Sequence, residues 1–161
     1  MVKENLDIRR ISVGFILLIT PIAIGIISSL LTIDMMNVYE TIIKPPFSPP
    51  SYIFPIAWSI LYALMGCGLA FTYTTPSSKN RTYALILSGI QLAFNFSWSI
   101  IFFNLRNYFL AFVWLVLLLI SVIGMLHYYR KVSKLSFYLN LAYPVWLVFA
   151  GYLNLMILIL N

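Results

Sequence analysis

Aromatic residues recur at helical spacing in three apolar segments of this sequence, and they are the residues whose types could do chemistry. The aromatic residues of each set fall on one face of a helix, because they lie three or four residues apart, and Gln91 and Asn95 lie alongside the second set. The sets are Phe54, Trp58 and Tyr62; Gln91, Phe94, Asn95, Trp98 and Phe102; and Tyr143, Trp146, Ala150 and Asn154. Stacking rings and orienting amides would suit a large planar apolar ligand, while plain packing between helices explains the same spacing equally well.

These segments lack the residues that acid–base or nucleophilic catalysis requires. No Asp, Glu, Lys or Arg falls inside any of them, which also disfavours a carboxylate-driven pump. His127 is the single histidine, and an interfacial position is favoured over a haem or metal ligand. Cys67 is the single cysteine, so an intrachain disulfide and a CxxC metal or redox pair are excluded. We therefore expect no catalytic triad, no metal and no resident cofactor.

The composition describes an integral membrane protein. Of the 161 residues, 62% are hydrophobic and 9% are charged, and the mean hydropathy is +0.97, values outside the range of soluble domains. The net charge of +6 favours interaction with anionic lipid. A nucleic-acid partner is disfavoured, because no basic stripe with interleaved aromatics lies outside the apolar segments.

Five apolar segments are long enough to cross a bilayer as helices and must position the aromatic residues. We expect one all-α integral membrane domain over residues 1–161. Its helices are predicted at residues 11–31, 51–73, 82–103, 108–128 and 137–160, the first kinked near Pro21. The connection over residues 32–50 is the long one, with a short interfacial helix predicted at 35–43. The link at 104–107 predicts that the third and fourth helices are antiparallel neighbours.

The long connection is rich in proline. Four prolines within six residues, Pro45, Pro46, Pro49 and Pro50, fix φ and remove backbone donors. This stretch cannot be helical, and we expect an ordered, extended loop that aims the second helix.

Basic residues predict the orientation. The N-terminal tail and the second and fourth loops would share one face of the membrane, and the first and third loops the other. The first face holds Lys3, Arg9, Arg10, Lys79, Arg81, Arg130, Lys131 and Lys134, and the second holds Lys44 and Arg106. The positive-inside rule then places the N-terminus in the cytoplasm, with the proline loop and the C-terminus on the opposite side.

Several short motifs, taken in order, resemble the TspO/MBR family, the bacterial tryptophan-rich sensory proteins and the mitochondrial translocator protein, formerly the peripheral benzodiazepine receptor. The resemblance covers about four-fifths of the chain, after the first helix. Its residues are Tyr39, Lys44, Pro45, Pro49, Pro50, Trp58, Leu61, Tyr62, Gln91, Leu92, Asn95, Trp98, Phe102, Phe103, Tyr143, Trp146, Phe149, Ala150, Leu153 and Asn154.

The resemblance implies a five-helix bundle, commonly a homodimer, whose pocket opens toward the first loop and binds porphyrins, sterols or isoquinoline and benzodiazepine ligands. It implies that Trp58, Tyr62, Asn95, Trp98, Trp146 and Ala150 line the pocket, and that Tyr39 and the proline loop with Pro49 and Pro50 form its lid. Porphyrin would then be a ligand or a substrate. The corresponding role would be porphyrin binding in tetrapyrrole handling or in stress sensing.

Other functions stay open at this point. Some bacterial relatives resemble light-dependent porphyrin-degrading enzymes, in which tryptophans at the Trp58 and Trp146 positions are implicated. A dimeric small-molecule transporter and a structural bundle without a ligand are further alternatives. The sequence departs from the family at Phe47, where a tryptophan is frequent, and in the order Tyr143–Pro144, which is expected to shift the kink of the fifth helix. The cholesterol-recognition pattern of animal members is absent after Asn154, so sterol import is not expected.

Overall fold

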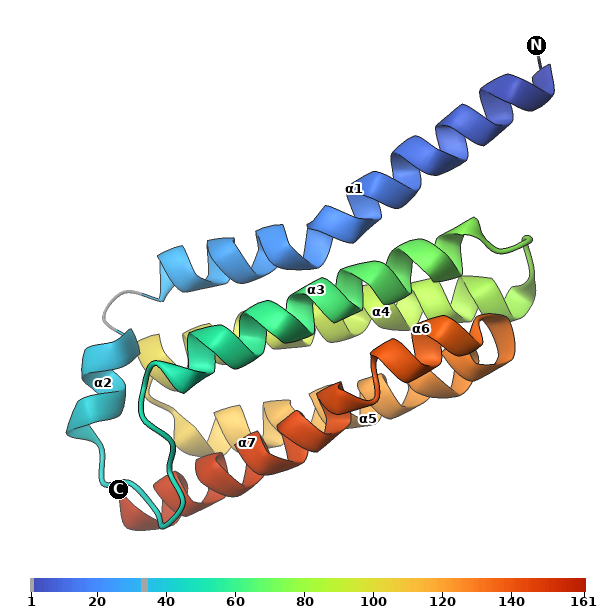
Figure 1. Ribbon diagram of the computed structural model, residues 1–161. Helices are drawn as coiled ribbons and strands as arrows, with labels where there is room; N and C mark the ends of the chain where they lie inside the picture. The colour runs from blue at the N-terminus through green and yellow to red at the C-terminus, as the bar shows by residue number, and fades with distance from the viewer. Residues whose placement is uncertain (1, 33–34) are drawn as a thin grey trace.

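The chain forms a bundle of long helices that lie side by side (Figure 1). The structure is a computed structural model that describes residues 2–32 and 35–161, without the side chains of residues 2–9. The elements are α1 (Val2–Leu31), α2 (Met35–Thr41), α3 (Ile53–Thr74), α4 (Lys79–Ser99), the π-helix η1 (Ile100–Asn104), α5 (Tyr108–Val132), α6 (Lys134–Leu139) and α7 (Ala142–Leu160).

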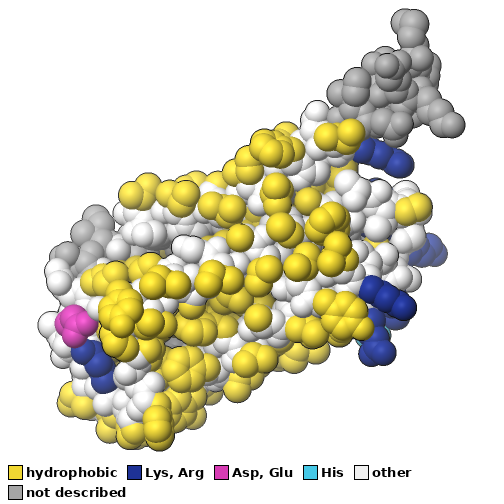
Figure 2. Space-filling model, viewed as in Figure 1, with side chains coloured by type: hydrophobic (Ala, Val, Ile, Leu, Met, Phe, Trp, Pro, Cys, Tyr) yellow, Lys and Arg dark blue, Asp and Glu magenta, His cyan; other side chains and the backbone are white. Residues whose placement is uncertain are grey.

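Within the described residues, five helical segments are long and apolar enough to span a membrane, as the sequence predicts. They are α1, α3, α4 with η1, α5, and α6 with α7. The two chain ends lie at opposite ends of the bundle (Figure 1). Exposed hydrophobic side chains cover the visible flank, while basic side chains gather at the end opposite α2 (Figure 2). This distribution suits a bundle surrounded by lipid along its length.

Several helix ends differ from the predicted ones. The first helix already includes residues 2–10, which hold no proline or glycine that would stop it. The third predicted helix begins earlier, because the Ser78 hydroxyl caps α4 by accepting from the Arg81 amide at 3.1 Å. The second begins at Ile53, two residues later than predicted, and the fourth continues to Val132.

The fifth predicted helix is broken in two. Pro144 has no amide hydrogen, and its ring would clash with the carbonyl of Asn140 in a continuous helix. The chain turns at Asn140 and Leu141, and the Tyr143 amide donates to the Asn140 carbonyl at 3.2 Å. The Asn140 side-chain amide donates to the Ser136 carbonyl at 2.9 Å and so satisfies the last turn of α6. The prediction of one helix over 137–160 was therefore wrong at this point.

Helix α1 packs against α3 through two glycines. A Cβ at Gly66 of α3 would overlap the backbone oxygen of Leu18, and a Cβ at Gly25 of α1 would overlap the ring of Tyr62. These positions let the two helices approach closely. Farther toward α2, residues of both helices line the cavity that is described in the next section.

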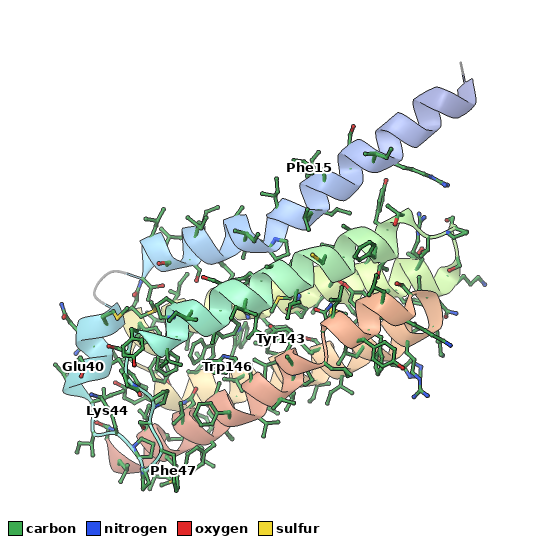
Figure 3. All side chains as sticks on the ribbon, viewed as in Figure 1. Phe15, Glu40, Lys44, Phe47, Tyr143 and Trp146 are labelled. Atoms are coloured by element: carbon green, nitrogen blue, oxygen red, sulfur yellow. The ribbon has the colours of Figure 1, made fainter. Side chains whose placement is uncertain are left out.

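The loop between α2 and α3 is extended, as its prolines predict. Pro45 to Ser48 form a tight turn, closed by a bond of 3.3 Å from the Ser48 amide to the Pro45 carbonyl. Pro46 precedes Phe47, whose φ is +66°, the pattern of a type II turn. The Phe47 side chain is 88% exposed at the end of the bundle (Figure 3).

Candidate functional site

A cavity of about 520 Å³ lies at the α2 end of the bundle, between α1, α2, α3, η1 and α7. This volume is typical of small-molecule sites, which run from about 300 to 1,000 Å³. Ten residues singled out from the sequence line it: Tyr39, Phe54, Trp58, Tyr62, Trp98, Phe102, Phe103, Ala150, Leu153 and Asn154. The residues predicted from helix periodicity and from the family resemblance thus lie around one cavity, although they come from α2, α3, α4, η1 and α7.

Helix α3 supplies the first aromatic wall. Phe54, Trp58 and Tyr62 all line the cavity. The rings of Trp58 and Tyr62 are stacked, with centroids 5.5 Å apart and planes inclined by 30°. Phe54 meets Tyr39 of α2 edge to face at 4.9 Å. These contacts fix the rings as a broad apolar surface.

The second aromatic wall comes from the end of α4 and from η1. Trp98, Phe102 and Phe103 line the cavity, and the centroids of Trp98 and Phe102 are 5.1 Å apart. The Trp98 indole donates to Asn154 Oδ1 at 3.3 Å, and Asn154 Nδ2 donates to the Tyr108 carbonyl at 2.9 Å. Asn154 therefore links the Trp98 indole to the Tyr108 carbonyl through the two ends of its amide.

Gln91 and Asn95 lie behind the first wall, in a buried hydrogen-bond network, and do not line the cavity. Asn95 Oδ1 accepts from the Tyr62 hydroxyl, and Asn95 Nδ2 donates to the Tyr143 hydroxyl at 2.8 Å. The Tyr143 hydroxyl donates to Gln91 Oε1 at 3.0 Å. Through Tyr62, this network orients the cavity wall from the side away from the cavity.

Trp146 also lies outside the cavity. It projects from α7 toward the bundle interior (Figure 3) and borders a shallow groove between α3 and α7. Its ring meets Trp58 edge to face, with centroids 6.4 Å apart, and meets Phe54 at 6.2 Å. Of the three tryptophans that the resemblance implies at the pocket, Trp58 and Trp98 therefore line the cavity, whereas Trp146 packs behind Trp58.

The two prolines expected in the lid act through their carbonyls and do not line the cavity. The Pro49 carbonyl accepts from the Tyr39 hydroxyl at 2.9 Å, which fixes the ring that closes the cavity. The Pro50 carbonyl accepts from the Ile53 amide at 3.0 Å, at the start of α3.

Helix α2 and the proline loop cover the end of the cavity. Tyr39 is only 5% exposed, and burial raises the pKa of its hydroxyl. Lys44 lies over the Tyr39 ring at 5.0 Å and donates to Glu40 Oε2 at 2.8 Å. This hydrogen bond lowers the pKa of the Glu40 carboxyl. Glu40 and Lys44 lie together at the α2 end of the bundle (Figure 3).

The end of α7 holds this cover in place. The Asn161 side chain accepts from the Ile43 amide at 2.9 Å and donates to the Ile43 carbonyl at 3.1 Å. The Tyr152 hydroxyl donates to the Pro46 carbonyl at 3.0 Å. We call α2 and residues 42–52 the cap.

The sequence did not single out the α1 side of the cavity. Ile22, Gly25, Ile26 and Ser28 line it from α1, and Met35 and Met36 line it from α2. The sequence gives only a weak indication that this side of α1 borders a cavity. Residues 22, 25, 26 and 29 share one face of the helix, and that face includes small residues. In so apolar a helix that pattern also fits a surface facing lipid.

Comparison with known proteins identifies relatives of this chain. The TspO/MBR family pattern matches residues 17–160. The chain is 38% identical to the tryptophan-rich protein TspO of Chlorobaculum tepidum, over 76% of this chain and 78% of the relative. It is 36% identical to the protein of that name from Archaeoglobus fulgidus, over 89% and 94%. Identity to the translocator protein of Ovis aries is 36%, over 72% and 70%.

The family match extends into α1, beyond the region in which the motifs were found. The arrangement of five apolar helices with a proline-rich cap and two aromatic walls accompanies it over the same residues. The chain therefore belongs to the TspO/MBR family.

Proposed function

We propose that this protein binds a porphyrin in the cavity between the two aromatic walls and acts in tetrapyrrole handling or stress sensing. The coarser role, ligand binding or sensing in a membrane, is supported by relatives named translocator protein and tryptophan-rich sensory protein. The observation that carries the finer proposal is that two aromatic walls line one cavity, the first with Trp58 and Tyr62 and the second with Trp98 and Phe102.

A planar apolar macrocycle fits this chemistry. Both walls offer rings for stacking, which contributes about 0.5–1.5 kcal/mol per aromatic pair beyond the area it buries. The polar groups at the cavity are few, and the amide of Asn154 is already bonded to Trp98 and to the Tyr108 carbonyl. Affinity would therefore come from stacking and burial, and selectivity from the spacing of the walls. Other flat ligands, such as isoquinolines or benzodiazepines, would compete for the same space.

Photo-oxidative porphyrin degradation is the second candidate. The edge-to-face contact between Trp58 and Trp146 favours it, because it places a second indole directly behind the one at the cavity. In this arrangement Trp58 would touch the porphyrin, and Trp146 would act through Trp58.

Titration with protoporphyrin IX in the dark and under illumination tests both candidates. Saturable quenching of tryptophan fluorescence, with the porphyrin spectrum unchanged in light, is expected for binding or sensing. Light-dependent loss of the Soret band that requires both Trp58 and Trp146 would make the protein an enzyme. Absence of saturable quenching would refute the porphyrin site.

The proposed orientation and assembly are separate questions. We propose a homodimer, as the family resemblance implies. We also propose that the N-terminus lies in the cytoplasm and the cap on the opposite side, as the basic residues of the loops predict. Crosslinking in native membranes and protease protection of the cap would test the two points independently.

A further inference from the structure

We infer that the cavity opens sideways into the bilayer between α1 and α3, and that its ligand enters from the lipid and not from water. This route rests on the ligand-binding function proposed above. It adds the physical class of the ligand, which is a molecule that partitions into the membrane before it binds.

The cavity lining is exposed on one side and buried on the other. Ile26 of α1 is 57% exposed, and Pro55 and Ser59 of α3 are also exposed, although all three line the cavity. On the α7 side, Asn154 and Ile157 line it and are fully buried. We call the α1–α3 edge formed by Ile26, Pro55 and Ser59 the mouth.

Helix α1 is bonded to the side away from the mouth. The Ser28 hydroxyl donates to the Phe96 carbonyl of α4 at 3.4 Å, and Asn104 Nδ2 of η1 donates to the Leu31 carbonyl at 2.9 Å. Of the two close approaches between α1 and α3, the one nearer α2 is at Gly25, against the Tyr62 ring. Beyond this point α1 follows α4 and η1, which leaves the edge toward α3 open.

The cap covers part of the water-facing end of the cavity, where Leu30 and Met36 also line it and are 71% and 41% exposed. Tyr39 is buried beneath the cap and bonded to the Pro49 carbonyl. Two bonds from Asn161 and one from Tyr152 fix the cap to α7. A ligand that passed through the cap would have to displace these contacts, whereas one that arrived through the mouth would displace lipid.

The mouth lies within the two apolar spans Arg10–Leu31 and Ile53–Thr74. Ile26 is five residues before the end of α1, which corresponds to about 7 Å along the helix axis. Ile56 and Ile60, next to the mouth on α3, are exposed apolar residues of the surrounding surface. Hydrophobic side chains dominate this flank in Figure 2. An apolar solute dissolved in the half of the bilayer nearest the cap would therefore meet the opening directly.

Cysteine labelling inside the cavity tests the route. Ala150 lines the cavity from α7 and is buried, so Ala150→Cys in a Cys67→Ser background gives one thiol on the wall opposite the mouth. The full-length protein is reconstituted in phosphatidylcholine vesicles. It is labelled either with pyrene maleimide dissolved in the bilayer or with a charged sulfonate maleimide in the water.

Neighbouring residues on α1 provide a matched pair of substitutions, one at the mouth and one beside it. Ile26 lines the cavity, whereas Ile27 is similarly exposed, at 49%, and does not line it. We expect the bilayer reagent to label faster than the charged one. We expect Ile26→Trp to slow it about tenfold, within the spread of association rates among variants of one binding site, and Ile27→Trp to leave it unchanged. Ser59→Trp and Ile56→Trp form a second such pair on α3.

Three results would overturn the inference. They are equal labelling rates in the paired variants, no labelling by the bilayer reagent, or faster labelling by the charged reagent that Asn161→Ala accelerates further. Thermal unfolding of each variant confirms that the fold is retained. Because labelling involves no porphyrin, the route can fail while protoporphyrin IX still binds, and porphyrin binding can fail while the route holds.

Discussion

Removing the amide of Asn95 should destabilise the bundle more than removing either tyrosine hydroxyl that it contacts. Asn95 is 2% exposed and links Tyr62 of α3 to Tyr143 of α7. Asn95→Leu keeps a side chain of similar size while both bonds are lost. The Tyr143 hydroxyl keeps Gln91 as its acceptor, whereas the Tyr62 hydroxyl loses the acceptor that Asn95 provides.

The magnitude follows from these contacts. An interhelical hydrogen bond in a membrane protein contributes about 0.6 kcal/mol on average. A buried hydroxyl left without a partner costs about 1–3 kcal/mol. Two lost bonds and one orphaned hydroxyl together lower the free energy of unfolding by about 2–4 kcal/mol. Tyr62→Phe loses one bond and leaves Asn95 Oδ1 without that donor, which by the same values lowers the free energy of unfolding by about 1.5–3.5 kcal/mol, one lost bond less than Asn95→Leu.

The double variant separates a network from independent effects. With both polar partners gone, no orphaned group remains between them, so the loss in Asn95→Leu/Tyr62→Phe should be smaller than the sum of the single losses by about 0.5–3 kcal/mol. Unfolding in mixed micelles, followed by circular dichroism, measures all three variants. Strict additivity, or a loss below about 0.5 kcal/mol for Asn95→Leu, would refute the network as described.

Three further predictions concern helix packing and the cap. Gly66→Ala should lower the free energy of unfolding by about 1–3 kcal/mol through overlap with Leu18, while Gly89→Ala, with open space around it, should raise it by about 0.5–1 kcal/mol; thermal unfolding measures both. Asn161→Ala should speed hydrogen exchange in the cap, and unchanged exchange would contradict the described bonds. Because the pKa of Glu40 is lowered in the folded state, its stabilisation is present above the ordinary glutamate pKa of about 4.3 and is lost as the pH falls through the folded value. Cap exchange should therefore accelerate in acid, and Glu40→Gln should remove this dependence.

The number of spans was readable from the sequence, because long uncharged segments have few alternatives to transmembrane helices. The ends of the helices were harder to predict, since they depend on single residues. The Ser78 hydroxyl extends α4 at its start, and Pro144 divides the last helix. The proline shows in the sequence, but the side chain of Asn140 that completes the end of α6 depends on the fold.

The cavity was predictable in part. Periodicity identifies the face of a helix but not how deep each residue lies. Asn95 and Trp98 share a face, yet Trp98 reaches the cavity and Asn95 is bonded between two tyrosines behind it. The lining residues of α1, such as Ile26, have the composition of a lipid-facing surface, so only the packing of α1 reveals that they border a cavity.

The dissociation constant for protoporphyrin IX in lipid nanodiscs, compared between matched tryptophan variants, tests the central claim most directly. Trp98 lines the cavity, whereas Trp114 does not and packs against Phe94, bonded to Ser97. Trp98→Phe should weaken binding by roughly 2- to 10-fold, the equivalent of about 0.5–1.5 kcal/mol. Trp114→Phe should leave the constant unchanged. Equal effects of the two substitutions, or no saturable binding by the unaltered protein, would contradict a porphyrin site between these walls.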